Sequence, residues 1–200
     1  MSKRPDAPAA RRNRVPILEV LRDELSNSRS VLEIGSGTGQ HAVYFAATLD
    51  QLTWQTSDRV FNHSGINAWI DFSDLDNVLP PLDIDVLMTI EVEGEYDAIF
   101  SSNTTHIMGM VAVRRMFALA GRTLPVEGIF CLYGPFNIEG TFTSESNKSF
   151  DRSLRAENPE MGIRDLEVLD DIANAINLER VRLYAMPANN MIAVWQKQGG

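Results

Sequence analysis

The sequence predicts an α/β protein with a mostly parallel β-sheet that is covered by helices on both faces. Short apolar segments alternate with amphipathic segments along the chain, which is the order typical of that class. A glycine-rich stretch follows the first apolar segment, and an aspartate closes the second. A chain of 200 residues is expected to fold as one domain, residues 1–200.

The charged residues are distributed unevenly along the chain. There are 18 Lys and Arg against 27 Asp and Glu, a net charge of −9, yet residues 1–14 carry five basic side chains and one acidic side chain. We therefore expect a basic N-terminal arm, residues 1–14, on an acidic body. An acidic body disfavours nucleic acid as a partner, because such binding depends on neutralising phosphates.

Cysteine content and hydropathy indicate the compartment. The single cysteine, Cys131, excludes an internal disulfide bond and favours a reducing environment. No apolar run reaches the ~18–20 residues of a membrane span, and no secretory signal follows the basic start. The sequence therefore predicts a cytoplasmic protein with no membrane partner, and it leaves the oligomeric state open.

In the first half of the chain, strands and helices are expected to alternate. Pro16 suits the first position of a helix, and the apolar residues after it recur at helical spacing. The stretch 59–81 mixes Asn, Ser and Gly with apolar residues, so a poorly periodic helix and a loop are expected there. The expected strands are Ser30–Ile34, Leu52–Ser57 and Leu82–Val86, and the other expected helices cover 16–27 and 40–49.

In the second half, the expected elements surround one long insertion. Residues 134–163 show little periodicity and are rich in Gly, Pro, Ser and Asn, which favours a lid over a site. The last two strands have no helix between them, so they are expected to pair as an antiparallel hairpin. The expected strands are Tyr96–Ser102, Gly128–Tyr133, Glu179–Ala185 and Met191–Gln196, and the expected helices are Ile107–Ala120, ending at Gly121, and Asp165–Asn177.

The glycine-rich stretch is the most informative part of the sequence. Gly35, Gly37 and Gly39 alternate with Ser36 and a threonine between a strand and a helix. Glycine permits a tight turn and a close approach of the backbone to a ligand, and the helix start offers free N–H groups. Asp58, 19 residues after Gly39, ends the next strand, where an acid accepts hydrogen bonds from ribose hydroxyls.

The residues beside the glycines discriminate between nucleoside cofactors. A dinucleotide fingerprint places glycine at position 40, where this chain has Gln40. Glu33, two residues before the first glycine, gives the order acid-x-Gly-x-Gly-x-Gly that is typical of class I methyltransferases. There the acid reaches the methionine amino group of S-adenosylmethionine. His41 begins the following helix and is expected at the cofactor site, behind the residues that touch the ligand.

Further motifs give the chain a more specific resemblance. They span residues 8–195, and three of them, near the C-terminus, are uncommon elsewhere. The motifs include Arg12-Asn13, Trp54-Gln55, Tyr133-Gly134-Pro135-Phe136, Ser146-Asn147, Asn158-Pro159-Glu160 and Met186-Pro187-Ala188-Asn189-Asn190. The chain resembles the methyltransferase-like protein 26 family, also described as the domain-of-unknown-function 938 group. The resemblance implies a Rossmann-like class I methyltransferase fold, with a seven-stranded, mostly parallel sheet and an antiparallel last strand, and it implies S-adenosylmethionine as the cofactor.

The resemblance also implies where the adenine lies. In class I enzymes a polar residue near the end of the third strand faces the adenine amino group. Asp85 and the adjoining Val86 match that position, and Asp83 is the nearby competitor. A strand-end aspartate in water is the alternative interpretation.

Three residues are candidates for the chemistry. Asn103 follows the fourth strand, where it could orient a donor atom or the methionine part of the bound cofactor. His106 lies one helical turn later and could deprotonate a nucleophile, or simply pack. Tyr133 ends the fifth strand at the same sheet edge, where ligands bind in open parallel sheets, and either lines the acceptor pocket or packs beneath it.

The sequence predicts in-line transfer of a methyl group from S-adenosylmethionine to a small-molecule acceptor. That chemistry requires alignment and exclusion of water rather than a metal ion. A protein acceptor, a cofactor-binding protein without catalysis and a nicotinamide-dependent reductase remain alternatives, and Gln40 argues against the last. The acceptor itself is not indicated by any motif.

Overall fold

The computed structural model describes residues 4–199, so the first three residues of the expected basic arm and Gly200 lie outside the described residues. The main sheet has seven strands in the order β3-β2-β1-β4-β5-β9-β8. Its first five strands are parallel, whereas β9 is antiparallel to β5 and to β8. The strands are β1 Ser30–Glu33, β2 Thr53–Asp58, β3 Val78–Asp83, β4 Ala98–Ser102, β5 Ile129–Gly134, β8 Leu178–Met186 and β9 Asn190–Lys197.

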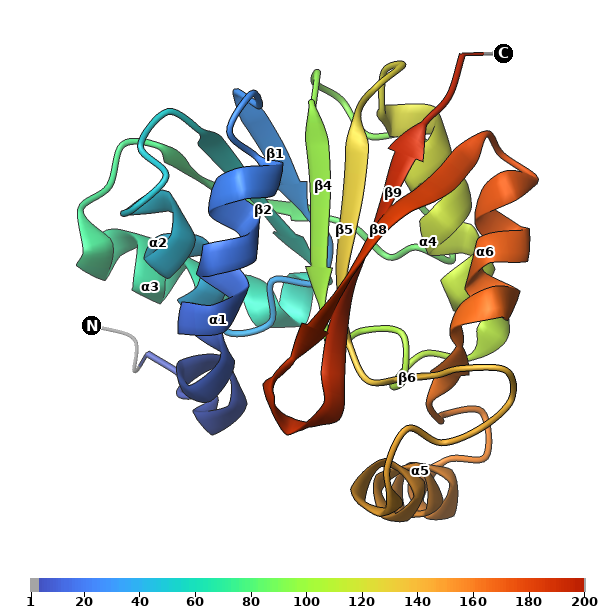
Figure 1. Cartoon of the computed structure of the whole chain (residues 1–200). Helices are drawn as coiled ribbons and strands as arrows, with labels where there is room; N and C mark the ends of the chain where they lie inside the picture. Colours follow the sequence, from blue (N-terminus) through green and yellow to red (C-terminus); the bar gives the residue numbers. More distant parts are fainter. Residues whose placement is uncertain (1–3, 200) are drawn as a thin grey trace.

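The described residues form six α-helices, and five of them cover the two faces of the sheet (Figure 1). Helices α1, α2 and α3 lie on one face, and α4 and α6 on the other. The helices are α1 Pro8–Glu24, α2 Gln40–Ala46, α3 Val60–Ser73, α4 Met110–Thr123, α5 Glu145–Glu157 and α6 Leu166–Asn174. The Rossmann-like class I methyltransferase fold predicted from the sequence is confirmed.

Apolar side chains from both faces of the central strands form the core. Alternate residues of β5 point in opposite directions, so Phe130 packs with α4 and α6 while Cys131 packs with α1 and α2. All six residues of β5 are buried, as expected for a parallel strand with helices on both sides. No helix within residues 4–199 combines the length and apolarity needed to cross a membrane.

The first helix begins earlier than the sequence indicated. Helix α1 starts at Pro8, and Pro16 lies inside it, so the prediction that Pro16 begins the helix is wrong. The buried side chains of its first turns are Ala10 and Asn13, followed by Ile17. These positions have helical spacing, but an alanine and an asparagine do not register as an apolar stripe. Residues 8–14 of the expected arm are therefore helix.

The third strand is also displaced from its predicted position. It spans Val78–Asp83 rather than Leu82–Val86, so Asp85 lies beyond the strand rather than at its end. Pro80 and Pro81 argued against a strand here, because proline has no N–H to donate to a neighbouring strand. However, β3 is at the edge of the sheet and has a neighbour on one side only, so prolines are tolerated. The predicted hairpin of the last two strands is confirmed.

Helix α4 does not end at Gly121 as predicted but continues to Thr123. A Cβ atom at Gly121 would lie 2.9 Å from Ile176 Cδ1, so glycine here permits the close approach of the segment after α6. The residue therefore serves packing between helices rather than helix termination.

The insertion at residues 134–163 contains regular structure, although its sequence shows little periodicity. It includes α5 and the short strand β6, Phe136–Asn137, which pairs with β7, Arg164–Asp165. The buried residues of α5 are Asn147, Asp151 and Leu154. Because two of these are polar, the helical periodicity was not visible as an apolar pattern. Helix α5 lies beyond the carboxyl ends of the parallel strands (Figure 1).

Candidate functional site

The glycine loop joins β1 to α2 at the carboxyl edge of the sheet. Gly35, Gly37 and Gly39 all have positive φ, at 78°, 58° and 86°. The N–H groups of Gly35 and Ser36 donate to the Ser57 carbonyl, at 3.1 and 2.8 Å, which ties the loop to β2. A Cβ atom at Gly37 would meet nothing within 4 Å, so this side of the loop is open to a ligand.

Asp58 brings its carboxylate to the glycine loop. Its Oδ2 accepts the Gly37 N–H at 2.7 Å, and its Oδ1 accepts the Arg59 N–H at 2.8 Å and the Asn62 side-chain amide at 2.9 Å. The structure thus joins two residues that the sequence placed at one nucleoside site. These three hydrogen bonds fix the orientation of the half-buried carboxylate.

Glu33 lies beneath the loop and is buried. Its Oε2 accepts hydrogen bonds from Ser36 Oγ at 2.8 Å and from Trp54 Nε1 at 3.1 Å. Burial raises the pKa of Glu33 to about 7, although both hydrogen bonds lower it. The carboxyl group therefore supports the loop from inside and titrates close to neutral pH.

His41 and Tyr133 meet at a buried asparagine of α1. Nε2 of His41 lies 2.8 Å from Asn13 Oδ1, and the His41 ring stacks on Phe45. Burial lowers the pKa of His41 to about 4, so the ring is neutral at pH 7. Burial raises the pKa of Tyr133, while a hydrogen bond with Asn13 lowers it. Asn13 thus links α1 to the ends of both the glycine loop and β5.

The residues after β4 form the next part of the same edge. Asn103 has φ of 59° and donates its N–H to the Tyr133 carbonyl at 2.8 Å. His106 is buried, and its ring lies edge-on to Phe150 of α5, with 5.3 Å between centroids. Burial and the positive charge of Arg164 lower the pKa of His106 to about 4. The ring is therefore neutral at pH 7.

Asp85 and Val86 follow β3 in a turn. Asp85 is half-buried, and its Oδ1 accepts the Leu87 N–H at 3.0 Å. Val86 is buried in the core on the α4 side. Asp83, the competitor noted above, pairs with Asp58 across the strands and is exposed.

Sequence reasoning did not bring Arg164 or Asn137 to the region of Thr105 and His106. Arg164 donates from Nε to the Thr105 carbonyl at 3.1 Å and from Nη2 to the carbonyls of Met108 and Glu160. The atoms Thr105 Oγ1, His106 Nδ1 and Asn137 Oδ1 are buried without a hydrogen-bond partner among the described residues. Arg164 and Asn137 come from β7 and β6, so no local motif links them to His106.

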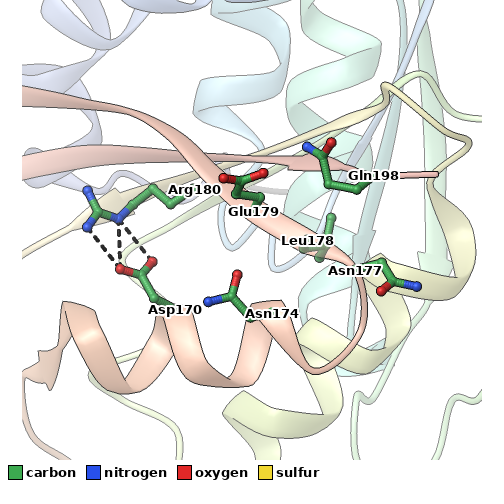
Figure 2. A pocket seen from close by; sticks show the side chains of 7 residues that line it. All are labelled: Asp170, Asn174, Asn177, Leu178, Glu179, Arg180 and Gln198. Carbon is green, nitrogen blue, oxygen red and sulfur yellow. Dashed lines mark hydrogen bonds and ion pairs between the residues drawn. The ribbon is translucent and has the colours of Figure 1, made fainter. Parts of the chain in front are cut away.

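Two cavities are lined by none of the site residues described so far. Figure 2 shows one of about 400 Å³, beside the ion pair of Arg180 with Asp170 at 2.9 Å. It borders Leu178 and Gln198, at the amino ends of the parallel strands, so it is separate from the glycine loop. A groove of about 370 Å³ lies at the carboxyl edge, between the β8–β9 hairpin and the insertion near Ile138.

Solved structures of similar fold are methyltransferases by name. An O-methyltransferase family protein from Burkholderia thailandensis is 13% identical, with a TM-score of 0.79 over 93% of this chain and 56% of that one. An O-methyltransferase family 2 protein from Planctomyces limnophilus, in complex with apigenin, is 17% identical, with a TM-score of 0.81 over 94% and 58%.

Human N-acetylserotonin methyltransferase, in complex with S-adenosylmethionine, is 11% identical, with a TM-score of 0.76 over 93% of this chain and 56% of that one. This chain therefore spans little more than half the length of these proteins. At such identities the likeness establishes the fold alone. A family model described as "Protein of unknown function (DUF938)" matches residues 4–197, and the chain belongs to that family.

Proposed function

We propose that this protein is an S-adenosylmethionine-dependent methyltransferase that acts on a small molecule. The observation that carries the proposal is the junction of the glycine loop with Asp58, whose carboxylate accepts the Gly37 N–H at 2.7 Å. Class I topology places this junction at the carboxyl edge, outside the strand ends, where open α/β sheets bind ligands. The complexes of the human and planctomycete neighbours support a nucleoside cofactor and a small acceptor.

The residues present fit such a cofactor. The open space at Gly37 leaves room for it, and Asp58 would accept hydrogen bonds from the ribose hydroxyls. The positive φ of three glycines turns the backbone tightly beside the start of α2, which favours a polar ligand. Asp85 or Asp83 would face the adenine. When bound, S-adenosylmethionine supplies a methyl group already activated by its sulfonium.

On the acceptor side, we propose that His106, Asn103 and Tyr133 border the nucleophile. A neutral His106 ring has a free lone pair at pH 7, so it could take the proton of an O–H or N–H nucleophile. Helix α5 places Phe150 against that ring, and the insertion would serve as a lid that keeps water from the acceptor. Nothing in this arrangement requires a macromolecular acceptor.

Calorimetry with S-adenosylmethionine and S-adenosylhomocysteine tests the cofactor assignment. We expect micromolar affinity, about −8 kcal/mol. Asp58→Ala should weaken binding by about 1.5–3 kcal/mol, because hydrogen bonds to a charged group are lost. Asp50→Ala, at an exposed position just before β2, is the matched control. Unchanged affinity in Asp58→Ala would contradict the ribose assignment.

Labelled cofactor and a cell metabolite extract test the reaction. Transfer of label to a low-molecular-weight fraction is expected. Label in protein would favour a protein acceptor instead. Tight cofactor binding with no labelled product in either fraction would indicate a binding protein without catalysis.

A further inference from the structure

The N-terminal segment, residues 4–13, is bonded to the start of α2, directly after the glycine loop. The Ala7 N–H donates to Gln40 Oε1 at 2.6 Å, and Gln40 Nε2 donates to Asp6 Oδ1 at 3.2 Å. The next residue, His41, is bonded to Asn13 at 2.8 Å. Gln40 and His41, at the start of α2, thus hold the segment at two places. Gln40 bonds residues 6 and 7, and His41 bonds Asn13.

The outer end of the segment is held by α3. Trp69 Nε1 donates to the Pro5 carbonyl at 2.8 Å. The Arg4 guanidinium carbon lies 3.3 Å from the centre of the Phe72 ring and 4.9 Å from that of Trp69. A Cβ atom at Gly65 would lie 2.7 Å from Pro5 Cγ, so the segment lies directly on this helix.

The segment therefore crosses from α3 to the glycine loop and then enters α1. The first turns of α1 extend past the carboxyl ends of the strands, on the same edge as the loop (Figure 1). A ligand bound to the loop N–H groups would lie beside this segment. Gln40 connects the segment to the loop. Its side-chain amide bonds the segment, and its Oε1 also accepts a hydrogen bond from Thr38 Oγ1 of the loop at 3.0 Å.

We propose that residues 4–13 form the outer wall of the cofactor pocket, and that Gln40 is the positioning residue that clamps this wall to the glycine loop. The proposal rests on the proposed function, because it concerns the same cofactor. The wall blocks the path between the loop and water on this side. Cofactor exchange then requires the wall to open, so the clamp sets the rate at which the cofactor dissociates.

Stopped-flow dissociation of S-adenosylhomocysteine tests the clamp. Gln40→Ala removes two hydrogen bonds of the wall and should raise the dissociation rate about 10-fold, and deletion of residues 1–7 about 100-fold. Gln51→Ala is the matched control, because Gln51 lies beyond the far end of α2 and its side-chain amide donates to the Leu25 carbonyl, at 3.5 Å, outside the wall. Its dissociation rate should equal that of the wild type.

Trp69 reports on the wall independently of the cofactor. Trp54 and Trp195 are fully buried, whereas Trp69 is half-buried under Arg4, so release of the wall should shift its emission to longer wavelength. The shift is expected in the deletion variant and not in Gln51→Ala. This readout also separates loss of the wall from general unfolding, which would expose all three tryptophans and lower the melting temperature.

The outcomes distinguish this proposal from the proposed function. A wild-type protein that binds neither S-adenosylmethionine nor S-adenosylhomocysteine would overturn both. A wild type that binds, with unchanged dissociation rates in Gln40→Ala and in the deletion variant, would overturn the wall alone. Faster dissociation in both variants, with the shifted Trp69 emission in the deletion variant, would support it.

Discussion

The two halves of the carboxyl edge differ in how completely their polar atoms are paired. In the glycine-loop half, buried side chains bond one another, as Ser36 and Trp54 do with Glu33. In the half formed after β4 and β5, buried atoms lack partners. Of the four such atoms found in residues 4–199, three lie here: Thr105 Oγ1, His106 Nδ1 and Asn137 Oδ1.

The two halves therefore differ in how many of their buried polar atoms are hydrogen-bonded within the protein. A buried polar atom without a hydrogen bond costs about 1–3 kcal/mol, so such atoms are rare in folded proteins. The glycine-loop half bears little of this cost and is stable in its present form. The other half bears it, and a bound acceptor or an ordered water molecule would relieve it.

The largest expected effect concerns the unpaired half. If His106 is the general base, His106→Ala should lower turnover by about 10²–10⁴-fold and leave cofactor affinity nearly unchanged. The wild-type rate should fall as pH decreases toward the pKa of about 4, since a protonated ring accepts no proton. His106→Gln keeps the volume without the base and should lose as much activity. Turnover of His106→Gln near that of the wild type would limit His106 to shaping the pocket.

In the glycine-loop half, Glu33 should make the free energy of unfolding depend on pH. Glu33 has a pKa of about 7 when folded and 4.5 in its unperturbed form, so its protonation favours the folded state. That stability is present below pH 4.5 and is lost as pH rises to about 7, a loss of about 3 kcal/mol. Glu33→Gln retains an oxygen for both hydrogen bonds and should lose this dependence.

Urea unfolding of the wild type and of Glu33→Gln, at pH 5 and at pH 8, measures this loss of stability. His41 and His106, whose pKa values are lowered to about 4, make both proteins more stable as pH rises from 4 to 6.5. Their contribution cancels in the comparison between variants. Parallel pH profiles for wild type and Glu33→Gln would show that Glu33 does not titrate in this range.

The glycine loop allows a comparison between two of its own residues. Alanine at either Gly35 or Gly37 must adopt a positive φ, at a cost of about 1–2 kcal/mol. At Gly35 the new Cβ would also lie 2.8 Å from Thr104 Cγ2, whereas at Gly37 it meets nothing. Gly35→Ala should therefore lose about 1–3 kcal/mol more of the free energy of unfolding.

Cofactor affinity should separate the same two variants in another way. Gly37→Ala keeps most of its stability but places a methyl group in the space assigned to the ligand, so its affinity for S-adenosylhomocysteine should fall. Gly37→Val should bind more weakly still. Wild-type affinity in Gly37→Val would place the ligand elsewhere on the loop.

The smallest expected effect comes from two fully buried threonines, one in each half. They test directly whether the two halves differ in hydrogen bonding. Thr105 Oγ1 has no partner, whereas Thr56 Oγ1 donates to the Leu79 carbonyl at 2.7 Å. Thr105→Val should raise the free energy of unfolding by about 1 kcal/mol, and Thr56→Val should lower it by a similar amount. Denaturant unfolding measures both. A destabilised Thr105→Val would mean that its hydroxyl is already satisfied, for example by water.

The sequence predicted the glycine-loop half better than the other. The loop and Asp58 are a local pattern, in which each residue type is required by the turn or by the strand end that carries it. The other half is assembled from segments far apart in the chain. Arg164 reaches the carbonyl of Thr105, 59 residues earlier, and Phe150 meets His106 from α5. Neither contact can be predicted from the spacing of residues along the sequence.

The errors in α1 and α5 have the same origin. The first turns of α1 and the inner face of α5 bury asparagine and aspartate where periodicity analysis expects apolar residues. Those side chains are paired with distant groups: Asn13 with His41, and Asp151 with the Ile163 N–H. A hydrophobic pattern identifies only faces buried by apolar side chains, so helices docked through hydrogen bonds escape it.

The paired prolines of β3 have a consequence for how molecules of this protein meet one another. An unprotected edge strand is a template on which a second chain can add its own strand, the first step of aggregation. Pro80 and Pro81 both lack an N–H group, and because adjacent strand residues point their N–H groups to opposite sides, one of the two prolines removes a donor from the open edge of β3. At the other edge, β8 has a bulge between the charged residues Arg180 and Arg182. Both ends of the sheet are thus poor templates, which disfavours assembly of copies by extension of the sheet.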